Sequence, residues 1–245
     1  MTRALTAILY APGTNCHEET AAAMNRAGLA SETVLLRDLL DERLFLNKYQ
    51  AMVIPGGFSY GDHLGAGRVF ATLLVARLGE QLREFLAAGK PMLGICNGFQ
   101  VLAETGILPS RSPGKRGMAL LENQPARFED RKVRLFVSRK ECLWTQDLAG
   151  QVLEMPSAHG EGRPLFPGSP GGNSRVVLSY ADAAGSPTRH YPENPNGAPG
   201  AVAGITDETG FVMGLMPHPE RASLPGHYSQ DGLKLFKNLA RQLRS

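Results

Sequence analysis

The stretch KPMLGICNGFQVLAE, residues 90–104, decides the fold and supplies the first candidate for chemistry. Its apolar part, residues 91–95, predicts a buried strand, and residues 98–106 have the pattern of a helix. Between them Cys96 stands in the spacing Gly-x-Cys-x-Gly, which is typical of a sharp strand-to-helix turn that presents a nucleophile. Most cysteines in such apolar surroundings are small core residues. The role of Cys96 therefore depends on what else the chain brings near it.

Apolar runs alternate with helical patterns through the first half of the chain, which favours parallel strands covered on both faces. The expected strands are residues 5–10, 33–37, 51–57 and 91–95, and the expected helices are residues 15–28, 66–88 and 98–106. Asn15 is the expected cap of the first helix and Gly28 its end.

The second half of the chain has a different pattern of apolar residues. Short strand candidates separated by turns predict an antiparallel or mixed portion added to the parallel sheet. Residues 162–174 are rich in proline and glycine and predict a mobile surface loop, and residues 231–243 predict a closing amphipathic helix. We therefore expect a three-layer α/β sandwich, with a central mostly parallel sheet, in one domain over residues 1–245.

The composition argues against several classes of function. The chain has 245 residues, 42% hydrophobic and 20% charged, which is ordinary for a soluble globular protein. A net charge of +3 is too small to indicate nucleic-acid or anionic-membrane binding. Cys16, Cys96 and Cys142 form neither a disulfide framework nor a CxxC zinc pair, so we expect no metal site. Reduced thiols and the lack of a signal-peptide pattern at the N-terminus predict a cytoplasmic protein.

A base for Cys96 is predicted in the sequence PHPER, where His218 follows an apolar strand candidate. The flanking prolines forbid a regular helix and favour an extended segment. In an extended segment alternate residues share a face, so Glu220 is placed to accept a hydrogen bond from His218 and fix its tautomer. Taken alone, PHPE is more often a turn with a solvated histidine. Together with Cys96 it has the logic of nucleophile, base and orienting carboxylate.

Three other features compete for a role. Cys16 and His17 are adjacent, and adjacent side chains on a helix do not face each other, so we expect them at a helix start without catalytic function. His159 ends a strand candidate with Glu161 two residues on, and the sequence leaves open a site element, an interface element or a plain turn. Gly56 and Gly57 end the strand candidate at 51–57, where the Gly57 N–H is a possible second oxyanion donor. Two glycines alone are also compatible with a plain turn.

Taken together, PGGFSYGD, GICNGFQ and PHPER resemble, in this order, the class I glutamine amidotransferases. APGTNC, ENQPARFEDRKV, AHGEG and NPNG are similar to one subfamily, the glutaminase subunits of phosphoribosylformylglycinamidine synthase. The resemblance covers about residues 8–222. It implies a flavodoxin-like core within the expected α/β sandwich. In the loop DHLGAG, His63 and Gly65 stand where an aromatic residue and an arginine are more usual, so the partner contacts of that loop stay open.

The resemblance also implies roles. Cys96 would be the nucleophile, His218 the base and Glu220 its orienter, while the backbone N–H groups of Gly57 and Asn97 would hold an oxyanion. The substrate-binding residues implied are Gly56, Gln100, His159 and Gly160.

The implied reaction is hydrolysis of L-glutamine to glutamate and ammonia, in de novo purine synthesis. The ammonia would pass to a separate large synthetase subunit that uses ATP and Mg²⁺ to convert formylglycinamide ribonucleotide to formylglycinamidine ribonucleotide; a small third subunit is common in such systems. No cofactor is expected in this chain. The alternatives are a stand-alone cysteine hydrolase of γ-glutamyl substrates or esters, and a docking subunit with weak catalysis.

Overall fold

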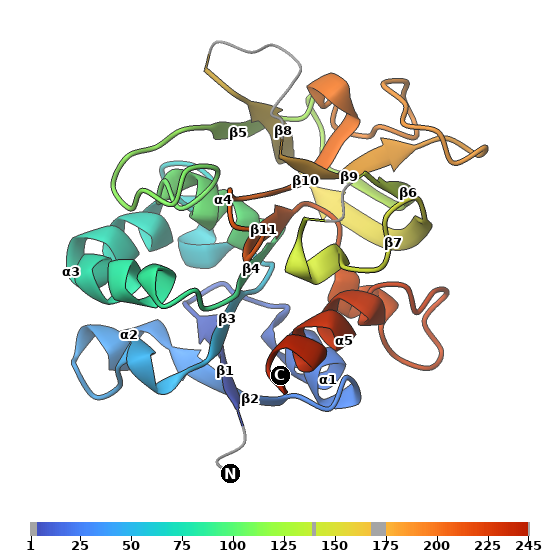
Figure 1. Cartoon of the computed structure of the whole chain (residues 1–245). Coiled ribbons are helices and arrows are strands. Elements are labelled where there is room, and N and C mark those ends of the chain that lie inside the picture. Colours follow the sequence, from blue (N-terminus) through green and yellow to red (C-terminus); the bar gives the residue numbers. More distant parts are fainter. Residues whose placement is uncertain (1–3, 139–140, 168–174, 245) are drawn as a thin grey trace.

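The strands of the central sheet run in the order β2-β1-β3-β4-β11-β10-β9-β6-β7 in the computed structural model, which describes residues 4–138, 141–167 and 175–244 (Figure 1). Neighbouring strands from β2 to β11 are parallel, and those from β11 to β7 are antiparallel. The bounds are β1 Leu5–Tyr10, β2 Ala30–Leu35, β3 Ala51–Ile54, β4 Met92–Ile95, β6 Glu129–Val137, β7 Val152–His159, β9 Val176–Ala181, β10 Val202–Thr206 and β11 Val212–Leu215. The predicted parallel sheet with an antiparallel addition is thus confirmed.

Helices cover both faces of the parallel part, as predicted (Figure 1). On one face lie α1 (His17–Arg26) and α5 (Leu233–Gln242), which contact each other. On the other lie α2 (Leu36–Leu40), α3 (Arg68–Ala87) and α4 (Asn97–Glu104). Short 3-10 turns occupy Leu46–Lys48, Ser59–Asp62, Leu143–Thr145, Pro199–Ala201 and Pro219–Ala222. The three-layer arrangement explains why β3, β4 and β11 are buried along their whole length.

The predicted end of the second strand and the predicted cap of the first helix need correction. The second strand ends at Leu35, where α2 begins, instead of at residue 37. Asn15 does not cap α1, because its side-chain oxygen accepts from the Cys16 thiol at 3.1 Å and no side chain caps this helix. Gly28, with φ +81°, does end it.

A small second sheet was not predicted. It pairs β5 (Ala119–Glu122) with β8 (Glu161–Leu165) in antiparallel register. The start of the predicted loop at 162–174 is therefore a strand, and residues 168–174 of that prediction lie outside the described residues. Because β8 follows His159 directly, this sheet forms one wall beside the carboxyl end of β7.

Candidate active site

Cys96 lies at the strained turn that the sequence predicts. It follows β4 and precedes α4, with φ 50° and ψ −106°, a backbone conformation that residues other than glycine rarely adopt. Strain of this kind is characteristic of a nucleophile held at a strand end. The flanking glycines are required, since a Cβ at Gly94 would lie 2.6 Å from the Gly98 carbonyl oxygen. A Cβ at Gly98 would lie 1.8 Å from that of Ile54.

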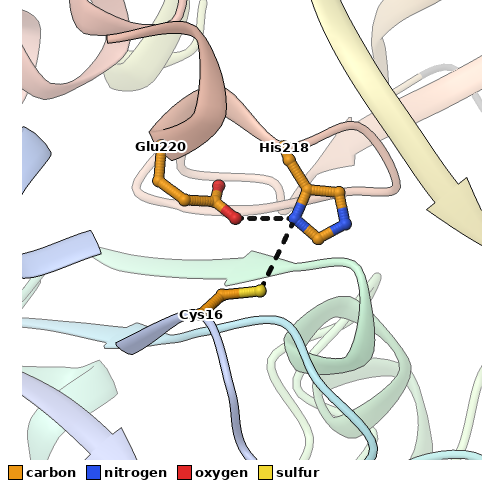
Figure 2. A group of neighbouring side chains, drawn as sticks. All are labelled: Cys16, His218 and Glu220. Atoms are coloured by element: carbon orange, nitrogen blue, oxygen red, sulfur yellow. Dashed lines mark hydrogen bonds and ion pairs between the residues drawn. The ribbon is translucent and has the colours of Figure 1, made fainter. Parts of the chain in front are cut away.

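His218 and Glu220 form a buried pair in the segment that follows β11 (Figure 2). His218 Nδ1 donates to Glu220 Oε1 at 2.6 Å. The pairing was predicted, but the extended segment stops at His218 (φ −104°, ψ 92°), and Glu220 is brought back by a 3-10 turn. The segment is tied to β7 because the His218 N–H donates to the Pro156 carbonyl at 2.8 Å. The 3-10 turn at Pro219–Ala222 thus brings Glu220 to His218, the pairing that an extended segment was expected to produce.

The charge state of His218 follows from its neighbours. Burial alone would lower the pKa of His218, but the Glu220 carboxylate and the contacts with Cys96 and Cys16 hold it well above its ordinary value. His218 Nε2 is buried and has no hydrogen-bond partner among the described residues. The thiol of Cys96 itself lies 3.5 Å from the Ala158 carbonyl oxygen. The arrangement places near Cys96 an imidazole that binds a proton strongly, so it can take up the thiol proton and form a thiolate–imidazolium pair.

The two predicted oxyanion donors have the required backbone. Asn97 is the first residue of α4, so its N–H has no carbonyl partner within the helix. Gly57 has φ +145°, and a Cβ there would lie 2.7 Å from both the Asn15 nitrogen and the Gly13 oxygen. Only glycine fits this position. Within the described ranges, neither N–H is engaged in a backbone hydrogen bond outside regular elements.

Cys96 opens onto a pocket that contains most of the predicted substrate-binding residues. Its lining is Gly57, Phe58, Asp62, Ala66, Cys96, Gln100, Phe128, Ala158, His159, Gly160 and Glu161. Gln100 accepts from the Asn97 amide at 2.8 Å and donates to the Glu161 carbonyl at 2.6 Å, so it braces the pocket wall. Gly56 does not line the pocket; it lies behind, with its carbonyl accepting from the N–H groups of Asn15 and Cys16.

The protonation of His159 can be read from its partners. The Asn123 amide nitrogen donates to two carbonyls, those of Arg127 (3.2 Å) and His159 (2.7 Å). Its oxygen must therefore accept from His159 Nδ1 at 3.1 Å, which leaves Nε2 as a bare acceptor. Burial, with the charge of His218 second, lowers the pKa of His159 to about 3. His159 is thus a neutral acceptor in the pocket wall.

Two functional candidates were missed in the sequence. Asp62 lines the pocket, and burial together with the nearby Glu161 charge raises the pKa of Asp62. Its motif PGGFSYGD was noted, but nothing in the spacing indicated that this carboxylate faces the same pocket as Glu161. Cys16 was set aside at a helix start, yet its sulfur lies 3.9 Å from His218 Nδ1 (Figure 2).

Cys16, His218 and Glu220 offer a sulfur, a nitrogen and an oxygen within 4.8 Å of one another. Zinc ligands lie about 2.0–2.3 Å from the ion, which keeps tetrahedral ligands about 3.3 Å or more apart. His218 Nδ1 and Glu220 Oε1 are closer than that, at hydrogen-bond distance. In addition, Arg221 Nη2 donates to Cys16 Sγ at 3.2 Å. These contacts form a hydrogen-bonded group and do not fit a zinc ligand set.

The chain is similar to known glutamine amidotransferases. Residues 3–240 match the family of the CobB/CobQ-like glutamine amidotransferase domain. The chain is 41% identical to phosphoribosylformylglycinamidine synthase subunit PurQ of Dehalococcoides mccartyi, covering 100% of this chain and 99% of the relative. It is also 41% identical to the subunit of the same name from Pyrococcus furiosus, covering 98% of each.

A solved structure gives the same result for the fold. The structure described as PurLQS from Thermotoga maritima contains a chain with a TM-score of 0.79 and 32% identity, covering 99% of this chain and 100% of that one. Within the described residues, no helix is long and apolar enough to cross a membrane. From the match over residues 3–240 and the near-full-length relatives, the chain belongs to the CobB/CobQ-like glutamine amidotransferase family.

Proposed function

We propose that this chain is the glutaminase subunit of a phosphoribosylformylglycinamidine synthase in purine biosynthesis. The observation that carries the chemistry is Cys96, held at a strained turn beside the buried His218–Glu220 pair. The PurQ relatives match over nearly their whole length, and their name as subunits of phosphoribosylformylglycinamidine synthase supports this reaction for the chain. The partner is a separate large synthetase subunit, in keeping with the naming of these relatives as subunits and of the solved assembly as PurLQS.

The reaction begins when the Cys96 thiol proton passes to His218 Nε2 and the sulfur attacks the side-chain carbonyl of glutamine. The resulting oxyanion accepts from the N–H groups of Gly57 and Asn97, each worth roughly a 10²–10³-fold gain in rate. The C–N bond then breaks, His218 gives its proton to the departing nitrogen, and ammonia leaves a glutamyl thioester on Cys96. Glu220 keeps Nδ1 protonated, so that Nε2 is the atom that exchanges protons.

Water completes the cycle. His218 Nε2 takes a proton from a water molecule, which attacks the thioester carbonyl; the C–S bond breaks and the Cys96 thiolate regains a proton as glutamate leaves. General acid–base assistance of this kind contributes about 10²–10⁴-fold. His218 therefore acts in both halves of the reaction.

The pocket offers groups that suit the amino-acid end of glutamine. The carboxylates of Asp62 and Glu161 suit its α-ammonium group, while His159 Nε2 accepts hydrogen bonds from an N–H of the substrate. Gly160 offers its backbone next to them. The carboxylates of Asp62 and Glu161 explain why the pocket would prefer an amino acid to a simple amide as substrate.

Ammonia must be used by the partner, which by this proposal binds ATP and Mg²⁺; the present chain carries no cofactor of its own. A small third subunit completes the assembly. The three free thiols fit a cytoplasmic location.

A glutamine-like diazo-ketone tests the proposal in the assembled complex, with peptide mass mapping of the adduct. We expect one adduct on Cys96, protected by glutamine, and none on Cys16 or Cys142. A labelled residue other than Cys96, or inactivation without an adduct on it, contradicts the assignment. Rapid hydrolysis of γ-glutamyl peptides by the isolated chain, with no response to the synthetase, would instead favour the stand-alone hydrolase.

A further inference from the structure

Cys16 is a second buried cysteine next to His218, and the chemistry just described does not use it. Its side chain is 1% exposed, and Sγ lies 3.9 Å from His218 Nδ1 (Figure 2). Gly56 packs beside both: a Cβ at this position would lie 2.8 Å from His218 Cε1 and 3.2 Å from Cys16 Sγ. The Nδ1–Cε1 edge of the imidazole is therefore enclosed by a sulfur atom and a glycine backbone.

The sulfur is held in place from three directions. Arg221 Nη2 donates to Sγ at 3.2 Å, and Sγ donates to the Asn15 side-chain oxygen at 3.1 Å. The backbone N–H of Cys16 donates to the Gly56 carbonyl at 3.2 Å. Arg221 is in turn paired with Glu19 of α1 at 3.3 Å. The contacts link the start of α1 to the 3-10 turn that carries Glu220.

Cys16 is a neutral thiol in this setting. Burial raises the pKa of Cys16 and outweighs the contacts with His218 and Arg221 that lower it. A neutral thiol does not repel the Glu220 carboxylate, yet its sulfur lone pairs remain weak acceptors toward the Nδ1 side of the ring. A thiol that stays protonated also does not compete with Cys96 for glutamine.

We propose that Cys16, held by Arg221, is a positioning residue for His218: its sulfur keeps the imidazole oriented with Nδ1 on Glu220 and Nε2 toward Cys96. The inference rests on the proposed glutaminase function. Cys16 does not contact the reacting atoms and acts through the ring. Its removal leaves a void beside Nδ1 and takes away an acceptor that favours the imidazolium form.

The test uses the assembled complex and the variants Cys16→Ala and Cys16→Ser. For Cys16→Ala we expect kcat for glutamine hydrolysis to fall about ten- to a hundredfold, because small misplacement of a catalytic group has effects of this size. The KM for glutamine should change less than about twofold, since the pocket wall is intact. Cys16→Ser, which keeps an acceptor, should recover part of kcat. Synthesis from added ammonium should equal that of the wild type and so report an intact assembly.

The pH profile separates positioning from packing. The groups that face His218 are Glu220, Cys96, Cys16 and His159, with Arg221 behind Cys16. Without the acceptor at Cys16, the imidazolium loses its proton more readily, so the alkaline limb of kcat/KM should move to lower pH by about half to one unit. Cys142→Ala is the matched control, a buried cysteine outside the pocket, and should leave the pH profile unchanged.

Arg221→Ala gives a second line of evidence. If Arg221 acts through Cys16, the double variant Cys16→Ala/Arg221→Ala should be no slower than Cys16→Ala alone. Should Cys16→Ala not fold, Arg221→Ala decides in its place, because it removes the group that holds the sulfur: it must lower kcat and shift the alkaline limb. Wild-type kcat and pH profile in Cys16→Ala or, failing that, in Arg221→Ala, or a lower kcat with an unmoved alkaline limb, would overturn the positioning role. The proposed function fails separately, if Cys96→Ala still hydrolyses glutamine.

Discussion

His218 Nδ1 and Glu220 Oε1 are 2.6 Å apart in a part of the protein that solvent does not reach, with Glu220 fully buried. The imidazole of His218 therefore has one nitrogen committed to Glu220 and the other left for Cys96. Glu220→Gln should lower kcat for glutamine hydrolysis at least about 100-fold, since it removes the charge that fixes the tautomer and supports the imidazolium. Steady-state kinetics of the complex measure this. A Glu220→Gln variant within about twofold of wild type would show that the carboxylate is not needed.

The same pair makes stability depend on pH. The pKa of His218 is raised in the folded protein, so the folded state binds this proton more tightly than the unfolded chain does. The stabilisation is fully present below the ordinary value of 6.5 and is lost as the pH rises through the raised value. The difference in free energy of unfolding between wild type and Glu220→Gln, measured with urea, should therefore shrink as the pH rises from 6.5 through the raised pKa of His218. An advantage that grows with pH would contradict this sign.

Gly56→Ala should disturb the base without touching substrate. The new Cβ would lie 2.8 Å from His218 Cε1, and the buried ring has no room to withdraw. We expect kcat to fall more than about tenfold, with a lower melting temperature, because overpacking costs about 1–3 kcal/mol. Gly79→Ala is the matched control: it lies inside α3, and the nearest atoms to its new Cβ belong to the flexible end of Arg83, at 3.6 Å or more. It should be neutral or slightly stabilising, and equal effects in the two variants would refute the packing argument.

His159→Ala should raise the KM for glutamine. The neutral ring offers Nε2 as an acceptor in the pocket wall, and its removal takes away one buried hydrogen bond, worth about 0.5–1.5 kcal/mol. The expected rise in KM is thus up to about tenfold. Because the pKa of His159 is lowered to about 3, no limb of the pH profile above that value should belong to it. A limb near pH 6 that disappears in His159→Ala would contradict the assigned tautomer and charge.

Away from the pocket, Arg111 and Asp207 form a buried ion pair at 2.7 Å, and Asp207 is fully buried. Arg111→Ala leaves that carboxylate without its cation and should lower the free energy of unfolding by about 3 kcal/mol or more. Arg83→Ala, which breaks an exposed pair with Glu80, should cost less than about 1 kcal/mol. Urea unfolding at neutral pH measures both. Similar losses in the two variants would show that burial does not govern the contribution of these pairs.

The strand-to-helix turn at Cys96 was predictable because its signal is local: an apolar run, two glycines at fixed spacing and a helical pattern. The His218–Glu220 pair was predictable for the same reason, although the turn that joins them differs from the expected strand. The layer arrangement followed from the alternation of apolar runs and helical patterns.

What the sequence did not reveal depends on contacts between distant segments. The strand at Glu161–Leu165 exists because it pairs with Ala119–Glu122, and neither segment has a strong pattern alone. Cys16 was judged against its neighbour His17, whereas its partners His218 and Arg221 lie about two hundred residues further on. Only the fold brings α1 against the turn after His218.

The central claim is that Cys96 releases ammonia from glutamine for a partner. Its most direct test is Cys96→Ala in the assembled complex, with product formation measured once from glutamine and once from added ammonium. The account predicts that glutamine-dependent synthesis is lost and ammonium-dependent synthesis is retained. Retained synthesis from glutamine, or loss of both, would contradict it.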